Sequence, residues 1–214
     1  MLKEEVLDLV EESRQKRWIL LALNATHLAL TPKEIGAPHP GKFHPISLCN
    51  VIYKIISKVV TNRPKILLPL LISLEQFGYV EGRQILDGII LSHEVFHSLK
   101  TTKTPGMILK LDLSKASNKL SNLFIEEMLL SFGFCQDWVQ WILSLISSTF
   151  FSILVNGSPS SMLLSSRGIC LGDPLSPFLF ILMVEGLRHM IQSTMIDHTL
   201  RDLSLHNSPS MAYQ

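Results

Sequence analysis

The sequence of 214 residues predicts an α+β fold that is rich in helices. Most apolar side chains recur at the 3.6-residue period of amphipathic helices, and only a few short segments have the composition of strands. Hydrophobic residues make up 47% of the chain and charged residues 17%, which supplies enough apolar surface for a packed core. We therefore expect one sizeable domain or two small ones, with a few strands that meet late in the chain.

The first part of the chain predicts two helices around one short strand. Residues 3–20 keep an apolar stripe among many charges, which indicates a helix. Residues 27–33 have the pattern of a strand, and residues 33–42 have the Gly and Pro density of a loop. Residues 46–63 again follow the helical period, so we expect a long helix that Pro64 stops or restarts.

The middle of the chain predicts helices at residues 85–100, at about 121–132 and at about 136–148. Between the first two of these helices, residues 106–113 form an apolar run that follows Pro-Gly, which is typical of a strand. No internal repeat or low-complexity segment interrupts this pattern.

The last part of the chain predicts a hairpin and a helix. Residues 150–168 are expected to form a β-hairpin, because Asn156-Gly157 has the composition of a tight hairpin turn. The last helix is expected from Pro174 to about Gln192, since proline is well tolerated in a first helical turn. The residues that follow are polar and weakly patterned.

The sequence carries no signal for a membrane or for secretion. Its longest apolar blocks, residues 141–155 and 177–186, are interrupted or shorter than the roughly 18–20 residues that a membrane span needs. The charged N-terminal helix has no apolar signal region. Cys49, Cys135 and Cys170 lie far apart and are expected to be reduced thiols. We therefore expect an intracellular protein, in the nucleus or cytoplasm, without a membrane partner; nothing points to a defined oligomer.

The net charge of +1 makes no case for nucleic acid, but local runs of cations do suggest one. Such runs can follow phosphates, although solvated helix faces have the same composition. They comprise Lys54, Lys58, Arg63 and Lys65, and then Lys100, Lys103, Lys110, Lys115 and Lys119. Lys33, Lys42 and His44 also surround the Gly- and Pro-rich loop, where cations can hold a triphosphate.

A lone carboxylate, Asp112, stands at the end of the predicted strand 106–113. Many enzymes present a metal ligand in this way, at the point where a buried strand meets a loop. The alternative is that Asp112 caps a short helix or shapes a turn. The residues around it do not decide between these two interpretations.

The segment 165–177 has the composition of a ligand-binding loop that opens a helix. Gly168 and Gly172 allow the backbone to approach another group closely. Asp173 then precedes the predicted helix, whose first amides could face an anion. A plain loop with a helix start explains the same residues.

A short match to the H-E-x-x-H pattern of zinc hydrolases occurs at His93, Glu94 and His97. In that pattern the two histidines bind zinc and the glutamate acts as a base. No third ligand stands out, although Glu126 or Glu127 could serve. Because the pattern is short and often occurs by chance, two ordinary helical histidines explain the match better.

Several long motifs together resemble the reverse transcriptase domain of plant non-LTR (LINE-type) retrotransposons. They occur in the order and spacing of that family, from about residue 2 almost to the end of the chain. The motifs are FHPISLCNVIYKIISKVVTNR (43–63), EQFGYVEGRQILDGIILSHEVFHSL (75–99), KLDLSKASNKL (110–120), FGFCQDWVQWILSLISSTFFSILVNGSPS (132–160) and SRGICLGDPLSPFLFILMVEGL (166–187).

The resemblance implies a right-hand polymerase fold, here a fingers-and-palm fragment with a small antiparallel palm sheet. It implies RNA-directed DNA synthesis on an RNA template with a DNA primer, by a nucleotidyltransferase that uses two Mg²⁺ ions roughly 3.5–4 Å apart. Asp112 stands where the family has its first catalytic, metal-binding aspartate. The implied nucleotide-binding residues are Lys33, His44, Leu113, Ser117, Gly168, Gly172 and Asp173.

The chain departs from the family at several of these positions. Ser117 and Asn118 stand where an aromatic residue and an aspartate are usual, so we expect weaker discrimination against a 2′-hydroxyl. His44 replaces an arginine and cannot offer a guanidinium fork to phosphate. Cys170 and Leu171 replace Arg-Gln, which removes one charge and one amide.

The largest departure is the absence of the second palm motif, an aromatic-x-Asp-Asp turn, because no Asp-Asp occurs in these 214 residues. One carboxylate cannot hold two metals, so we expect a truncated, catalytically inactive fragment, with residual nucleic-acid binding as an alternative. The resemblance divides the chain into a helical lead-in at 1–25, partial fingers and palm at 26–195, and an irregular truncated tail at 196–214.

Overall fold

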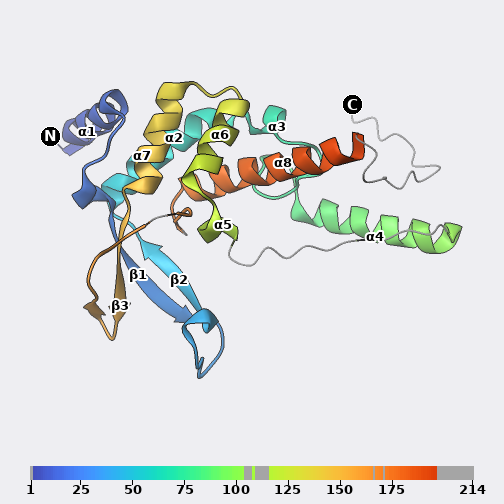
Figure 1. The fold of residues 1–214 in the computed structure, drawn as a ribbon, viewed down its shortest axis with the longest axis horizontal. Coiled ribbons are helices and arrows are strands. Elements are labelled where there is room, and N and C mark those ends of the chain that lie inside the picture. Colours follow the sequence, from blue (N-terminus) through green and yellow to red (C-terminus); the bar gives the residue numbers. More distant parts are fainter. Residues whose placement is uncertain (1, 104–107, 109–115, 166, 171, 197–214) are drawn as a thin grey trace.

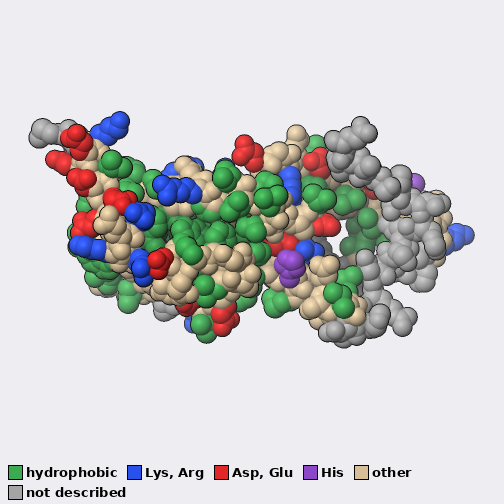
Figure 2. Space-filling model, turned by 90° about the horizontal axis from the view of Figure 1, so that it is seen from above, with side chains coloured by type: hydrophobic (Ala, Val, Ile, Leu, Met, Phe, Trp, Pro, Cys, Tyr) green, Lys and Arg blue, Asp and Glu red, His purple; other side chains and the backbone are tan. Residues whose placement is uncertain are grey.

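The computed structural model describes residues 2–103, 108, 116–165, 167–170 and 172–196. A group of packed helices forms the body, and a small twisted sheet projects from one side of it (Figure 1). This architecture confirms the predicted α+β class, with helices in the majority. Figure 2 shows that charged side chains gather at the end of the body where α1 lies. Hydrophobic side chains occupy much of the middle of the body in the same view.

The helices follow the predicted order closely, because their apolar periods are local properties of the chain. Two short 3₁₀ segments, η1 (Leu21–Asn24) and η2 (Pro40–Lys42), flank the first strand. The α-helices are α1 (Leu2–Lys16), α2 (Val51–Lys65), α3 (Leu68–Leu71), α4 (Ile85–Thr102), α5 (Ala116–Lys119), α6 (Asn122–Ser131), α7 (Gln136–Ser147) and α8 (Leu175–Ile196).

The sheet has the strand order β2-β1-β3-β4, and β5 also pairs with β3. Its strands are β1 (Ala25–Pro32), β2 (Phe43–Leu48), β3 (Phe150–Val155), β4 (Ser158–Pro159) and β5 (Leu163–Leu164). The pairing of β1 with β2 is antiparallel, whereas β1 and β3 run parallel. The sheet is therefore mixed rather than wholly antiparallel, because the helical chain between β1 and β3 forms a crossover connection.

The prediction of one helix over residues 46–63 was wrong at its start. Phe43–Leu48 is the edge strand β2, and Pro45 lies opposite Leu30 of β1. Proline lacks an N–H, so it is tolerated on an edge strand. Helix α2 begins after Asn50, whose side chain accepts a hydrogen bond from the Ile52 N–H at 2.9 Å. Pro64 does not stop this helix, which includes it in the last turn.

The predicted hairpin is confirmed at its turn. Asn156 and Gly157 both have positive φ, +50° and +79°, as a two-residue hairpin turn requires. They join β3 to β4, whose Ser158 pairs with Val155. The predicted strand 106–113 lies outside the described residues apart from its exposed Ile108.

The hydrophobic core lies between α2, α6, α7 and α8, with α8 running through the body (Figure 1). Each of these helices contributes side chains that are almost fully shielded from solvent. They are Tyr53 and Ile56 of α2, Ile125 and Leu129 of α6, Val139, Ile142 and Leu145 of α7, and Leu175, Leu179 and Leu182 of α8.

Helix α4 differs from the other long helices because none of its side chains is buried. It projects from the body and exposes apolar residues that include Ile85, Leu86, Ile90 and Phe96 (Figure 1). Among the described residues, no helix has both the length and the apolar content that crossing a membrane would require.

We expect Leu179→Ala to lower the free energy of unfolding by about 2–5 kcal/mol, because it removes a fully buried side chain and leaves a cavity in the core. The matched control is Leu130→Ala on α6, where the side chain is 39% exposed and the expected loss is about 1 kcal/mol or less. Urea unfolding followed by circular dichroism measures both. Equal losses would contradict the central place of α8.

Candidate functional site

Five segments, some of them far apart in the sequence, meet at a small cavity on one face of the sheet. Residues of strands β1, β2 and β3 line it, together with one residue of α5 and with residues 165 and 167–170 before α8. The cavity has a volume of about 120 Å³. Its lining comprises Leu28, Pro45, Ser47, Asn118, Phe151, Ser165, Arg167, Gly168, Ile169 and Cys170.

Two backbone hydrogen bonds hold the loop against α5. The Gly168 N–H donates to the Leu120 carbonyl at 2.8 Å, and the Ile169 N–H donates to the Ser117 carbonyl at 3.0 Å. Gly168 has φ +85°, and a Cβ placed on it would lie only 2.7 Å from the Asn118 carbonyl oxygen. Only glycine fits this position, because it has no Cβ and tolerates positive φ.

Gly172 brings the same segment close to the sheet. Its φ is +98°, and a Cβ placed there would lie 3.2 Å from the Ser47 carbonyl oxygen of β2. The prediction that the two glycines permit close backbone approach is therefore confirmed. Their partners here are other parts of this chain.

Asp173 is buried between the start of α8 and the middle of α2. It accepts hydrogen bonds from the Tyr53 hydroxyl at 3.1 Å, from the Ser57 hydroxyl, and from the Leu175 N–H at 3.3 Å. Burial raises the pKa of this carboxyl group above its ordinary value, although the three donors act in the opposite direction. The fold alone therefore accounts for Asp173, whose predicted contact with a nucleotide stays a prediction.

Sequence reasoning missed Tyr53 and Ser57, which hold the Asp173 carboxylate. A signal was present, because Tyr53, Ser57 and Thr61 recur every four residues along α2 and all three are buried. Polar side chains on the buried stripe of a helix need partners from elsewhere in the fold. Their spacing could have indicated a buried acceptor.

Lys33 and His44 lie at the outer part of the β1–β2 hairpin. The Lys33 N–H donates to the Lys42 carbonyl at 2.8 Å, and His44 pairs with Thr31 across the two strands. Both side chains are exposed. Successive residues of a strand point to opposite faces, so His44 lies on the face opposite to cavity-lining Pro45. The structure does not bring these two side chains to the cavity.

The two residues nearest the predicted chemistry lie outside the described residues. Asp112 and Leu113 belong to the segment between α4 and α5, so their predicted roles stay predictions. Ser117, by contrast, lies on α5 and its backbone carbonyl anchors the loop at Ile169. The described cavity thus adjoins the helix that begins four residues after Asp112.

Cys170 stands where the family resemblance would place the arginine of an Arg-Gln pair. Its side chain is buried at the cavity, with Sγ 3.9 Å from the Thr149 hydroxyl oxygen. Burial raises the pKa of this thiol to about 12, so it stays neutral at physiological pH. It therefore offers neither a positive charge nor a nucleophilic thiolate.

Comparison with known proteins identifies the family. Residues 31–206 match the family model "Reverse transcriptase (RNA-dependent DNA polymerase)". The chain belongs to this reverse transcriptase family. The matched range includes β2, α5, β3 and the loop before α8, which all border the cavity, whereas Leu28 of β1 precedes it.

The similar curated proteins are products of mobile elements. The chain is 26% identical over 191 residues to the transposon TX1 uncharacterized 149 kDa protein of Xenopus laevis, covering 89% of this chain and 15% of that protein. Identity is 25% over 171 residues to the Pol polyprotein of the type-1 retrotransposable element R2 of Popillia japonica, covering 79% and 24%. It is 28% over 167 residues to the R2DM polyprotein of Drosophila melanogaster, covering 76% and 15%.

These matches support a reverse transcriptase domain of a non-LTR, LINE-type element. The chain spans less than a quarter of the length of each of these relatives.

Reverse transcriptases are nucleotidyltransferases that typically use divalent metals, yet the described residues of this domain do not fit such an ion by themselves. Among them, no three His, Cys, Asp or Glu side chains lie together in a group that could hold a metal ion. The described cavity lining contains no carboxylate, and Asp173 already engages both of its oxygens. A metal site would depend on Asp112.

The H-E-x-x-H match lies on α4. His93, Glu94 and His97 are all exposed there, and the part of the chain that the structure describes supplies no third ligand. Since this helix falls inside the matched reverse transcriptase range, the zinc hydrolase alternative has no support from the family either.

We expect Gly168→Ala to destabilise the domain by about 1–3 kcal/mol more than Gly157→Ala does. Both glycines have positive φ, but only the Cβ at position 168 would meet the α5 backbone, since nothing lies within 4 Å at position 157. Denaturant unfolding of the two variants separates the clash from the strain that they share. Equal losses would show that the contact with α5 is unimportant.

We expect Asp173→Asn to change how stability depends on pH. The raised pKa means that the folded state holds the Asp173 proton more tightly than the unfolded chain, whose carboxyl has a pKa near 3.8. Wild-type stability relative to the variant should therefore fall as pH rises from this value through the folded pKa. Thermal unfolding of both proteins across this range measures the difference. A difference that rises with pH would contradict the buried, proton-retaining site.

Proposed function

We propose that this domain forms fingers and part of the palm of an RNA-directed DNA polymerase, and that it acts within a longer protein of a LINE-type element. The observation that carries the proposal is the assembly of β2, α5 and the loop 165–170 around one cavity. These segments lie within the matched range 31–206 and carry the motifs that resemble the family in the sequence, and the Asp112 segment directly precedes α5 in the chain. The proposed partners are an RNA template and a DNA primer, and the proposed location is the nucleus or cytoplasm.

The size of the cavity limits what the described residues do in this reaction. A volume of about 120 Å³ is well below the roughly 300–1,000 Å³ of small-molecule sites, so it cannot enclose a nucleotide. We therefore infer that this surface forms one wall of the nucleotide site. Ser47, Asn118, Ser165 and Arg167 supply its polar side chains, and the glycine contacts set its shape.

Magnesium is the proposed metal, held through Asp112. When bound, it would supply charge stabilisation at the reacting phosphates and activation of the primer hydroxyl. Because the described residues add no carboxylate to Asp112, we propose that the 214-residue chain alone does not extend a primer.

The test begins with the coding sequence beyond the codon for Gln214. If an aromatic-x-Asp-Asp segment follows in frame, we expect the longer protein to extend a DNA primer on an RNA template. Asp112→Asn should then reduce extension by a factor of 100 or more, because the groups of a metal site act as a unit. The control is Asp8→Asn, at an exposed carboxylate on α1 that is far from Asp112 in the sequence, and it should leave primer extension unchanged. Extension by the 214-residue chain itself would overturn the proposal of inactivity.

A second candidate function is nucleic-acid binding without catalysis. It is favoured by exposed cations on several elements of the domain. These are Lys54 and Lys58 on α2, Lys100 at the end of α4, Lys119 on α5 and Arg167 in the loop. Arg167 lines the cavity and the others lie on three helices of the domain, so together they offer exposed phosphate contacts that would bind a polyanion in a salt-dependent way.

We expect the chain to bind an RNA–DNA hybrid with an affinity that falls steeply between 50 and 200 mM salt, as phosphate contacts require. Arg167→Met should weaken binding and reduce the slope of log affinity against log salt by about 0.7–0.9, because it removes one such contact. Lys16→Met on α1 is the control, since Lys16 is already paired with Glu12. Fluorescence anisotropy measures each slope. Binding that is insensitive to salt would exclude this function.

A further inference from the structure

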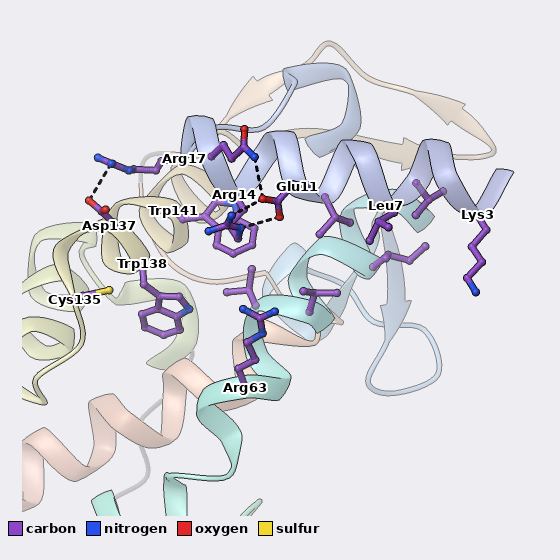
Figure 3. Close-up of a pocket in the computed structure, with 16 residues that line it drawn as sticks. Lys3, Leu7, Glu11, Arg14, Arg17, Arg63, Cys135, Asp137, Trp138 and Trp141 are labelled. Carbon is purple, nitrogen blue, oxygen red and sulfur yellow. Dashed lines mark hydrogen bonds and ion pairs between the residues drawn. The ribbon is translucent and has the colours of Figure 1, made fainter. Parts of the chain in front are cut away.

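A second and larger pocket lies away from the polymerase motifs, between α1, α2 and α7 (Figure 3). Its volume is about 770 Å³, which is within the range of sites for small organic molecules. One wall is α1, which precedes the first residue of the reverse transcriptase match at position 31. The family match therefore assigns no role to this pocket.

The pocket has an apolar interior. Val10, Val60 and Trp141 are buried around it, and Trp138 lies beside them. The Trp141 indole N–H donates to the Ser13 hydroxyl at 2.9 Å, which joins α7 to α1. The ion pair of Arg17 with Asp137, at 3.1 Å, joins α1 to α7 on the same side (Figure 3).

The charged residues around the pocket are unbalanced. Four cations line it, Lys3, Arg14, Arg17 and Arg63, against two carboxylates, Glu11 and Asp137. Arg14 is paired with Glu11 and Arg17 with Asp137. Lys3 and Arg63 make no ion pair within the described part of the chain. The lining therefore has a net charge of +2.

Arg63, in the last turn of α2, lines the pocket and adds a positive charge to it. Figure 3 shows its guanidinium directed toward the side where Arg14 and Glu11 lie. The pKa of Glu11 is lowered to about 2, first by hydrogen bonds from Arg14 and Gln15 and further by the charges of Arg14 and Arg63. Since Glu11 is already engaged by Arg14, the Arg63 guanidinium remains available to another anion.

We propose that this pocket binds a small amphipathic monoanion, an aliphatic carboxylate whose chain lies against the two tryptophans. The apolar interior provides the hydrophobic contact, and Arg63 provides the contact to the carboxylate. Each part of the ligand thus meets the matching chemistry: buried apolar surface gains from excluding water, and the unpaired guanidinium gains from an opposite charge. This binding is separate from polymerisation and does not depend on Asp112.

The three tryptophans of the chain provide the test. Trp138 and Trp141 line the pocket and Trp18 does not, so in Trp18→Phe all tryptophan emission reports on the pocket. The probes are 10-bromodecanoate and the neutral 10-bromodecanol, whose bromine quenches a tryptophan that it touches. We expect both to quench, with the carboxylate binding about threefold to fivefold more tightly, as one partly exposed ion pair allows.

Two variants in the Trp18→Phe background locate the anion contact. Arg63→Met should remove the preference for the carboxylate over the alcohol. Lys65→Met is the matched control, because Lys65 is an exposed cation two residues further along α2 that does not line the pocket. It should keep the preference.

A thiol reagent gives an independent readout. Cys135 is exposed and lines the pocket, whereas Cys49 and Cys170 are buried. Bound decanoate should slow the reaction of Cys135 with a maleimide. The proposal is overturned if neither probe quenches, if acid and alcohol bind equally to the Trp18→Phe protein, or if Lys65→Met removes the preference as Arg63→Met does.

Discussion

The described site depends on one constraint, which is that the backbone at Gly168 and Gly172 lies close to the backbone of α5 and of β2. At Gly168 the chain lies so close to α5 that a Cβ would meet the Asn118 backbone, and at Gly172 it lies close to β2. Both glycines have positive φ, which other residues adopt only with strain. Because no side chain separates these segments, motifs near residues 45, 118 and 168 share one cavity. The site is thus positioned by backbone contacts before any side chain contributes.

The same segment is anchored on its other side by the buried Asp173. A carboxylate out of water is costly unless donors surround it, and Tyr53, Ser57 and the Leu175 N–H provide them. These bonds join the start of α8 to the middle of α2, two of the helices that form the core. The loop therefore has a fixed end on the helical body and a close contact with the sheet. In this arrangement Asp173 serves the fold, whatever it also does toward a nucleotide.

How much could be predicted differs between helices and strands for a physical reason. The periods of α4, α6, α7 and α8 are local, so their positions could be predicted within a few residues. The turn at Asn156-Gly157 was also local. Strand β2 was missed because its extended form depends on pairing with β1, and Ile46 and Leu48 fit a helical period equally well. The pairing, rather than local preference, made this segment a strand.

By itself, the sequence determined the α+β class, the order of the helices and the reverse transcriptase family, because periodicity and motif order are properties of the chain alone. It also determined that no Asp-Asp accompanies Asp112 in these 214 residues. Only the tertiary structure decided that His44 lies on the face of β2 opposite to Pro45 and that Asp173 is hydrogen-bonded by side chains of α2. It also decided that α1 and α2 border a pocket whose Arg63 has no ion pair among the described residues. The physical reason is that burial and charge compensation arise between segments that are 120 residues or more apart in these cases, where no local pattern specifies the partner.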